Sequence, residues 1–280
     1  DTTICSGASL TIGSASVSGI TYSWSPVTGL SSATISNPVA TLTNATGSPV
    51  TVSYIVTTSL SGCSNTDTVD ITINPAPVAN AGPNQLLCSG NSVQIGTVDT
   101  AGYTYIWTPA LGLNSTTIAT PTVTLTNTGG SPITFIYIVT ATLNGCSSTD
   151  TVQVTSSPAA TANAGLDTVY CSGALVQIGG GSQANYSYSW TPAVGLSSAT
   201  ISNPTVTTVN TGTSPITTTY TLTTNLFGCT ATDDVTVTVN PSPISNAGTD
   251  QFFCAGTTVQ LGGTTTAGYS YSWNPATGLS

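Results

Sequence analysis

The chain has 280 residues and a formal net charge of −9, with no Lys, Arg, His or Met, and all nine acidic residues are Asp. Nucleic acid and anionic lipid are excluded as partners, because binding to phosphates requires the cationic side chains that this sequence lacks. Without imidazole, amine or guanidinium groups most acid–base, Schiff-base and oxyanion chemistry is excluded as well, and we expect neither enzymatic activity nor a cofactor.

An exact period of 83 residues organises the chain, without a single insertion or deletion. Three columns carry it, one of Trp and two of Cys: Trp24, Trp107, Trp190, Trp273; Cys5, Cys88, Cys171, Cys254; and Cys63, Cys146, Cys229. A unit of this length can bury a modest core of its own. Pro-rich junctions predict a first repeat at 1–75 that lacks part of its N-terminal strand, repeats at 76–158 and 159–241, and a truncated fourth repeat at 242–280.

Within each repeat the apolar residues alternate with a period of two, which predicts strands rather than helices. In chain order, the first repeat shows Leu10 and Ile12 before a Gly, Tyr22-x-Trp24-x-Pro26, a Gly-Leu-Ser turn, and a long apolar alternation through Tyr54. A Gly-Cys turn then reverses the chain into a last strand that ends near Ile73. The sequence therefore predicts an all-β protein, a tandem array of Ig-like/PKD-like β-sandwich domains.

The alternating aromatic residues allow two interpretations, a core or a platform for stacking sugars. Tyr and Trp on one face of a short strand favour the core, since aromatic rings supply much of the area that a small sandwich can bury. A polysaccharide-binding array would need the same rings exposed. The core residues predicted on this basis are Tyr22, Trp24, Tyr105, Trp107, Tyr188, Trp190, Tyr271 and Trp273.

All seven cysteines are predicted to form disulfides rather than a metal site. Pairing within a repeat gives Cys5–Cys63, Cys88–Cys146 and Cys171–Cys229, and leaves Cys254 to find a partner beyond Ser280. In an Ig-like topology, however, the two columns lie at opposite ends of a domain, about 25 Å apart, and a disulfide tolerates a Cα separation of only about 7 Å. The alternative joins consecutive repeats through Cys5–Cys146 and Cys88–Cys229. Both schemes remain open at this stage.

The Asp residues do not form the kind of cluster that calcium binding or glycoside hydrolysis would need, so no metal site and no catalytic residue is predicted. Asp67 and Asp70 are merely close in sequence, as are Asp233 and Asp234. Three formal N-glycosylation sequons, at Asn44, Asn114 and Asn185, are interpreted as turn chemistry.

The repeated motifs resemble the PKD-like and Ig-like repeats of giant secreted surface proteins of Bacteroidota, and the resemblance covers nearly the whole chain. In the second repeat it rests on Asn80-Ala81-Gly82, Cys88-Ser89-Gly90, Val93-Gln94-Ile95-Gly96 and Tyr103-x-Tyr105-x-Trp107-x-Pro109. The resemblance implies export by the type IX secretion system, an extracellular or cell-surface location, and roles in adhesion, gliding motility or filament formation. It implies no catalysis.

The same resemblance suggests O-glycosylation, which in Bacteroidota occurs at Asp followed by Ser or Thr and a small, mostly apolar set of residues. Candidate acceptors in such triplets are Thr2, Thr68, Thr100, Thr151 and Thr168. A structural role for these Asp residues, at strand starts or turns, is the alternative.

The sequence as a whole predicts a non-enzymatic segment that forms the stalk or filament shaft of an extracellular adhesin. The alternative function is a polysaccharide-binding array accessory to an enzyme or adhesin. Expected partners are the neighbouring repeats of the same chain and an unidentified surface or glycan ligand at the tip, with lateral self-association left open. The sequence has no apolar run long enough to cross a membrane and no signal peptide at its first residues.

Overall fold

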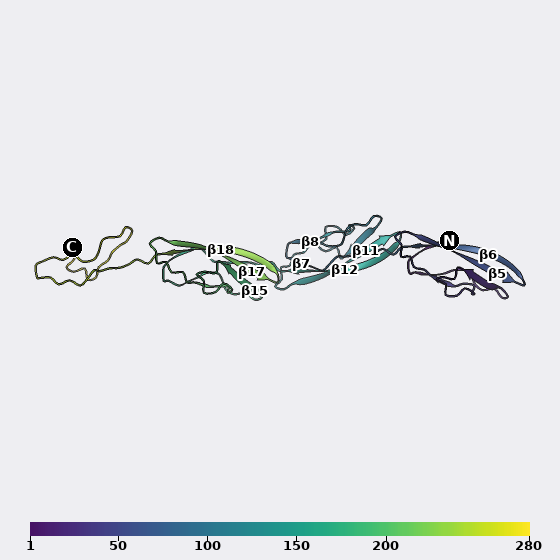
Figure 1. Ribbon diagram of the computed structural model, residues 1–280, viewed down its shortest axis with the longest axis horizontal. Helices are drawn as coiled ribbons and strands as arrows, with labels where there is room; N and C mark the ends of the chain where they lie inside the picture. Colours follow the sequence, from purple (N-terminus) through teal and green to yellow (C-terminus); the bar gives the residue numbers. More distant parts are fainter. The chain divides into compact units, whose positions relative to one another are not determined.

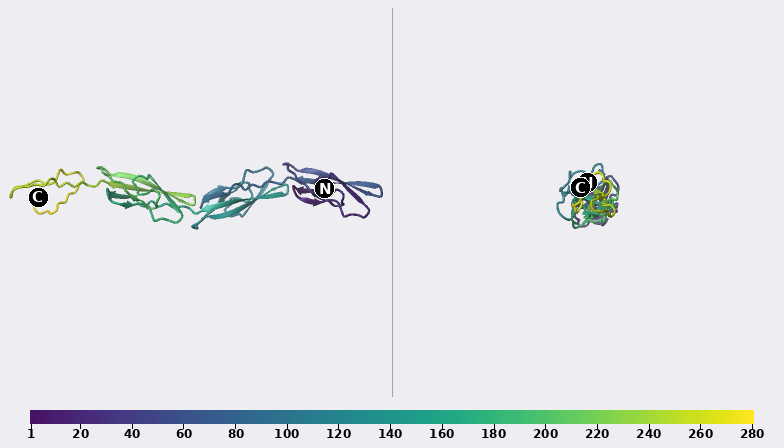
Figure 2. Two further views of the ribbon diagram at one scale, coloured as in Figure 1. Left: turned by 60° about the horizontal axis from the view of Figure 1, so that its bottom comes forward. Right: turned by 90° about the vertical axis from the view of Figure 1, so that its left-hand side faces the viewer.

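A computed structural model describes all 280 residues and contains eighteen strands and no helix. Six strands recur in each of the first three repeats, and the chain is drawn in Figures 1 and 2. In the first repeat they are β1 (Thr2–Cys5), β2 (Ser9–Thr11), β3 (Thr21–Ser25), β4 (Val39–Thr41), β5 (Val50–Leu60) and β6 (Cys63–Asn74). In the second they are β7 (Gln85–Cys88), β8 (Ser92–Gln94), β9 (Thr104–Thr108), β10 (Thr122–Thr124), β11 (Ile133–Leu143) and β12 (Cys146–Ser157). In the third they are β13 (Thr168–Cys171), β14 (Val176–Gln177), β15 (Tyr186–Thr191), β16 (Thr205–Val206), β17 (Ile216–Leu226) and β18 (Cys229–Asn240).

The chain divides into two compact units, residues 1–159 with 227–229, and residues 160–226 with 230–280. The first unit contains two pairs of sheets, of strand order β1-β6-β5-β3 with β2-β4, and β7-β12-β11-β9 with β10-β8. The second contains one pair, β13-β18-β17-β15 with β14-β16. The predicted tandem Ig-like β-sandwich array with a period of 83 residues is confirmed. The predicted repeat boundaries stay a prediction.

One feature of the topology decides where the cysteines lie. The first strand of each repeat pairs in parallel with the last, so that Cys5 lies beside Asn74, where the chain leaves the repeat. The last two strands form a long hairpin closed by a two-residue turn, as between Leu143 and Cys146. Both turn residues, Asn144 and Gly145, have positive φ. This is the backbone that a tight type I′ hairpin turn requires.

The core lies between the two sheets of each repeat, because alternate side chains of each strand point to the same face. In the second repeat Trp107, Tyr137 and Val152 from the large sheet pack with Val123 from the small one and with Ile95, which follows β8. Equivalent clusters surround Trp24 in the first repeat and Trp190 in the third. Each of these three indole N–H groups donates to a backbone carbonyl, that of Ile35, Ile118 or Ile201.

The predicted aromatic core needs two corrections. Tyr22, Tyr105 and Tyr188 are only half-buried. Their hydroxyls accept hydrogen bonds from backbone N–H groups five residues earlier.

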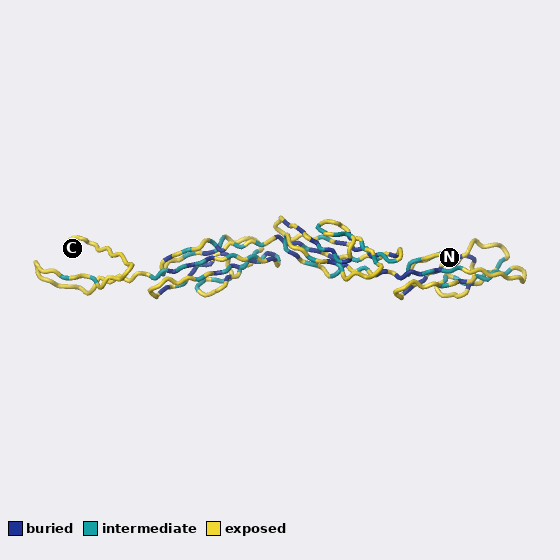
Figure 3. Tube along the Cα trace, turned by 90° about the horizontal axis from the view of Figure 1, so that it is seen from above, coloured by how far each residue is buried: buried dark blue, intermediate teal, exposed yellow.

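Tyr271 and Trp273 are exposed, at 52% and 40%. The strand β9, which carries Trp107, pairs with β11, and the positions equivalent to β11 in the fourth repeat come after Ser280. Residues beyond 241 accordingly form no strand and are exposed along almost their whole length (Figure 3).

A second aromatic column fills the core more completely than the predicted one. Tyr54, Tyr137 and Tyr220 are at most 1% exposed, and each hydroxyl donates to a carbonyl 26 residues earlier. Each of these Tyr residues lies at an inward position of a long strand with alternating apolar residues, which is consistent with burial. A Tyr in a strand has no motif of its own, however, so the sequence does not distinguish these residues as the centre of the core.

The buried phenol groups of Tyr54, Tyr137 and Tyr170 predict how the free energy of unfolding depends on pH. Burial raises the pKa of Tyr54, Tyr137 and Tyr170 above the usual 10.0. A raised folded-state pKa means that above about pH 10 the unfolded chain ionises first, so stability should be constant from pH 7 to about 9 and fall above 10. Urea unfolding of the protein with its free thiols alkylated should show this decline. Replacing the three Tyr by Phe should make the decline shallower, and a stability that rises above pH 10 would contradict the assignment.

Candidate functional site: the junction between repeats

Two disulfides join consecutive repeats. Cys5 bonds to Cys146 with an S–S distance of 2.01 Å and a Cα separation of 5.6 Å. Cys88 bonds to Cys229, also with a Cα separation of 5.6 Å. Both separations lie in the usual range for a disulfide. Residues 227–229 belong to the same compact unit as the second repeat, so both bonds lie within that unit.

The topology explains this connectivity. The first cysteine column ends the strand that runs parallel to the last strand, and therefore lies where the chain exits the repeat. The second column follows the hairpin turn, at the entry end of its own repeat. Of the two schemes left open by the sequence, the structure has the one that spans the junctions. The remaining cysteines, Cys63, Cys171 and Cys254, are unpaired and exposed. The alternative pairing within each repeat, Cys5–Cys63, Cys88–Cys146 and Cys171–Cys229, is therefore wrong.

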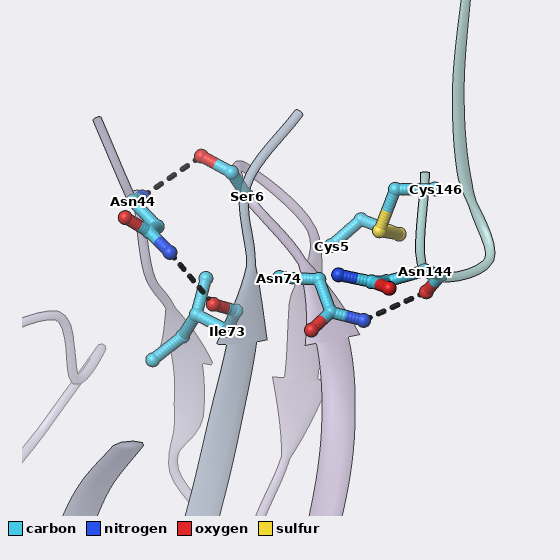
Figure 4. The surroundings of a disulfide bond; sticks show 7 residues. All are labelled: Cys5, Ser6, Asn44, Ile73, Asn74, Asn144 and Cys146. Atoms are coloured by element: carbon cyan, nitrogen blue, oxygen red, sulfur yellow. Dashed lines mark hydrogen bonds between the residues drawn. A yellow bond between two sulfur atoms is a disulfide. The ribbon is translucent and has the colours of Figure 1, made fainter. Parts of the chain in front are cut away.

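A hydrogen bond reinforces each disulfide. The side-chain amide of Asn74 donates to the carbonyl of Asn144 at 2.7 Å, beside the Cys5–Cys146 bond (Figure 4). At the next junction the hydroxyl of Ser157 donates to the carbonyl of Phe227 at 3.1 Å. The hairpin turn of one repeat is thus held both by a cysteine and by the last residue of the last strand of the preceding repeat. The sequence did not reveal this contact, because its partners are 70 residues apart.

A buried asparagine supports the same end of each repeat. Asn44 is 8% exposed, and its amide nitrogen donates to the carbonyls of Ser48 and Ile73, both at 2.8 Å. Its backbone N–H donates to the hydroxyl of Ser6, next to Cys5 (Figure 4). Asn127 and Asn210 make the corresponding bonds in the next two repeats. These side chains attach the loop after the small sheet to the strand that leads into the junction.

The linker that precedes each of the second and third repeats donates a backbone hydrogen bond to an Asp carboxylate. Ala81, which is fully buried, donates its N–H to Asp150 at 2.8 Å, and Ala164 donates in the same way to Asp233. Both Asp residues lie inside the last strands, β12 and β18, and not at the strand starts or turns expected from the sequence. The side chain of Asp150 therefore joins the linker to the sheet of its own repeat.

We predict that Asp150→Ala destabilises the second repeat by about 1–3 kcal/mol, because the buried N–H of Ala81 loses its acceptor. Hydrogen exchange at the Ala81 amide should accelerate, and the urea midpoint should fall. Asp99→Ala, in an exposed loop of the same repeat, is the matched control and should change neither. Equal effects of the two substitutions would show that net charge, and not this bond, is responsible.

The candidate O-glycosylation sites differ in solvent exposure and in secondary structure. Thr2, Thr68, Thr100 and Thr151 are exposed, whereas Thr168 is half-buried. Of the five, only Thr100 lies outside a strand. Their glycosylation stays a prediction.

No group of three or more Cys, Asp, Glu or His side chains is close enough to hold a metal ion. The structure also has no helical segment of the length and apolar character needed to cross a bilayer.

No protein-family model matches the sequence, and no curated protein is significantly similar to it. Several solved structures of tandem-domain proteins are similar to this chain. The I-band fragment I67–I69 of titin is 11% identical, with 87% of this chain and 95% of that one covered and a TM-score of 0.38. Drosophila OTK extracellular domains 3–5 are 10% identical, with coverages of 86% and 94% and a TM-score of 0.41. Mouse cadherin-23 EC22–24 is 12% identical, with coverages of 86% and 96% and a TM-score of 0.28.

Proposed function

We propose that this chain is a non-enzymatic structural segment that forms the shaft of an extracellular surface adhesin or filament. The observation that carries the proposal is the position of the disulfides, each of which joins one repeat to the next. A disulfide that closed a single domain would stabilise that domain and leave the junction free to bend. A bond across the junction restrains the relation between neighbours, which is what a shaft requires.

The other contacts at the junction support the same function. The Asn74–Asn144 hydrogen bond lies beside the disulfide, and the Asp150–Ala81 bond fixes the linker that follows. Persistent disulfides form in oxidising compartments, which favours a location outside the cell. The surface is rich in hydroxyl and amide groups and has no cations, so it offers nothing that would bind phosphate polymers.

The aromatic residues favour a shaft over a polysaccharide-binding array. Trp24, Trp107 and Trp190 are at most 3% exposed and use their indole N–H groups internally, so no ring face is offered to a sugar. The neighbouring rings of Tyr103 and Tyr105 stack on each other at 6.2 Å. Their hydroxyls accept from the backbone of Val78 and Thr100, so these rings too are engaged in packing the repeat.

Small-angle X-ray scattering of the monomeric protein in dilute solution tests this proposal. At ~3.3 Å per strand residue a repeat should advance roughly 40 Å, so a shaft gives a long, well-defined maximum dimension. Reductant should broaden the distribution of dimensions by loosening the junctions. The double variant Cys5→Ser, Cys146→Ser should broaden it partly without reductant. A compact particle, or a profile that reductant leaves unchanged, would contradict the shaft.

A further inference from the structure

The outer face of the large sheet differs among the three repeats. One face of each large sheet packs on the core and the other faces solvent, so alternate residues of its strands are exposed. Most outward residues are Thr or Ser, but the first repeat also carries Asp70 and the third Asp234. The second repeat has Gln153 and Thr151 at these places in the period, and no carboxylate among the outward residues of its strands.

Three isoleucines lie together on this outer face of the second repeat. Ile106, Ile136 and Ile138 are 57%, 55% and 39% exposed. Ile136 and Ile138 project from the same side of β11, about 6.6–6.8 Å apart along the strand. Ile106, on β9, pairs with Thr140 and is therefore diagonal to Ile138, at about 7–8 Å. We call this oblique row the isoleucine face, and Ile138, the middle residue of β11, is at its centre.

The fold does not require isoleucine at these three positions. The third repeat forms the same four-stranded sheet with Ser189, Thr219 and Thr221 in their place. The first repeat has isoleucine at only one of them, Ile55. The three side chains of the second repeat also point away from its core. A cluster of exposed aliphatic side chains that the fold does not need indicates a contact surface.

We propose that the isoleucine face binds the same face of a second copy of this chain, so that two copies associate side by side. As a way of bundling shafts the proposal rests on the proposed function, but the association itself can be measured without it. All residues of the face belong to one compact unit, so the contact needs no particular arrangement of the two units.

Charge selects this face among the three. The chain has a net charge of −9 and no Lys, Arg or His, so a second copy offers no cationic side chain to pair with a carboxylate. A carboxylate covered without a partner is strongly unfavourable. The outer faces with Asp70 and Asp234 are therefore unsuited to contact between copies, whereas the isoleucine face buries no charge. A two-fold axis near Ile138 places this side chain against its own counterpart, which is an isologous contact.

The area of the face determines the strength of the contact. At ~3.3 Å per residue β11 is ~36 Å long, and three strands at ~4.8 Å spacing are ~15 Å wide, so each copy contributes roughly 500 Å². A standard stable interface takes about 800 Å² from each partner. Thr134 and Thr155, at one end of the face, already hydrogen-bond to each other at 2.8 Å, so covering them costs little. Association should therefore be reversible and weak, with Kd on the order of 0.1–1 mM.

Sedimentation velocity from about 10 μM to about 1 mM tests the proposal. The free thiols are alkylated to prevent cross-linking, and the protein is unglycosylated, because a glycan on Thr151, directly opposite Ile138, would cover the face. We expect a monomer–dimer equilibrium that NaCl strengthens, because salt screens the repulsion between the two anionic copies and leaves an apolar contact intact. A monomer at every concentration, or a dimer that NaCl dissociates, would overturn the proposal.

A charge at the centre of the face should abolish the contact. Ile138→Asp brings two unpaired carboxylates together and should weaken dimerisation at least tenfold. Ile55→Asp, at the same place in the first repeat, adds the same charge to an exposed strand position and should leave dimerisation within about twofold of the unchanged chain. Equal effects of the two substitutions would show that net charge, and not this face, controls association.

A second variant removes the isoleucines without adding charge. The third repeat shows that the sheet forms with hydroxyl residues at these positions, so the urea midpoint should change little. Dimerisation should weaken at least tenfold, because the aliphatic contact is lost. Dimerisation that persists unchanged in this variant would rule out the isoleucine face. The variant is Ile106→Ser, Ile136→Thr, Ile138→Thr.

Transfer of the face to the third repeat is the converse experiment. A chain with two such faces can bind two neighbours, so it should form species larger than a dimer at concentrations where the unchanged chain forms dimers. Dimers alone would show that the aliphatic row is not sufficient for the contact and would contradict the proposal. The variant is Ser189→Ile, Thr219→Ile, Thr221→Ile, Asp234→Thr.

Methyl NMR of the unchanged chain locates the contact directly. The resonances of Ile106, Ile136 and Ile138 should shift with concentration, whereas that of Ile55 should not. Shifts confined to other isoleucines would place the contact elsewhere and overturn the proposal. Failure here is distinguishable from failure of the proposed function, since an extended chain that never associates contradicts only the isoleucine face, and a compact chain that dimerises through it contradicts only the shaft.

Discussion

Reduction should lengthen the extensible chain by roughly 600 Å when the protein is pulled by its two ends. In the oxidised protein the shortest covalent path from Cys5 crosses to Cys146, runs back along the backbone to Cys88, and crosses to Cys229. Only the segment 88–146 bears load between residues 5 and 229. The remaining ~166 residues of that stretch, at ~3.6 Å each, are shielded until the bonds are cut. Single-molecule force spectroscopy, with and without reductant, measures this difference.

The double variant Cys5→Ser, Cys146→Ser makes the prediction sharper. With only Cys88–Cys229 left, the path between residues 5 and 229 follows the backbone from 5 to 88, which is longer than the original path by just ~25 residues, or ~90 Å. Unreduced, the variant should therefore resemble the unchanged protein, and reductant should then add the rest. If the unreduced protein extends to the full contour of its sequence, the junction-spanning bonds are not present in solution.

Gly96→Ala is expected to unfold or severely destabilise the second repeat, by ~3 kcal/mol or more. Gly96 has φ of +83°, and an added Cβ would overlap the carbonyl oxygen of Ala119 and press on the ring of Trp107. These neighbours are backbone and a buried indole, and neither can move aside cheaply. Urea unfolding followed by the fluorescence of Trp107, with the other tryptophans replaced by phenylalanine, measures the effect.

Gly90→Ala is the control, because it separates the backbone strain of an alanine at positive φ from the steric overlap of its Cβ with neighbouring atoms. Gly90 has nearly the same φ, +84°, but nothing lies within 4 Å of the added Cβ. It should therefore cost only the backbone strain, about 1 kcal/mol. If both substitutions cost the same, close packing under Trp107 is not what requires the glycine.

The period, the succession of strands along the chain and the buried tryptophans of the first three repeats could be predicted because each has a local sequence signal. Tyr22-x-Trp24-x-Pro26 lies within five residues, and the cysteine columns repeat without an indel. The disulfide connectivity could be narrowed to two schemes but not decided. Its outcome depends on β1 lying parallel to β6, a pairing between segments about 70 residues apart that no local pattern encodes.

The junction contacts were missed for the same physical reason. In the sequence Asp150 belongs to a candidate glycosylation triplet, but its partner is the N–H of Ala81, 69 residues earlier. A backbone donor has no residue type, so nothing in the sequence marks it. Asn127 was likewise not recognised, because one of the two carbonyls that accept from it, that of Ser156, lies 29 residues later in the chain.

The two cystine loops overlap, and this gives the chain a tolerance to cleavage. The loop closed by Cys5–Cys146 and the loop closed by Cys88–Cys229 share the segment 88–146. A protease that cuts before Cys88 leaves the pieces joined through Cys5–Cys146, and one that cuts after Cys146 leaves them joined through Cys88–Cys229. After a single cut between Cys88 and Cys146, both disulfides still connect the two pieces. Every peptide bond from residue 5 to residue 229 can therefore be broken singly without parting the two ends of the molecule.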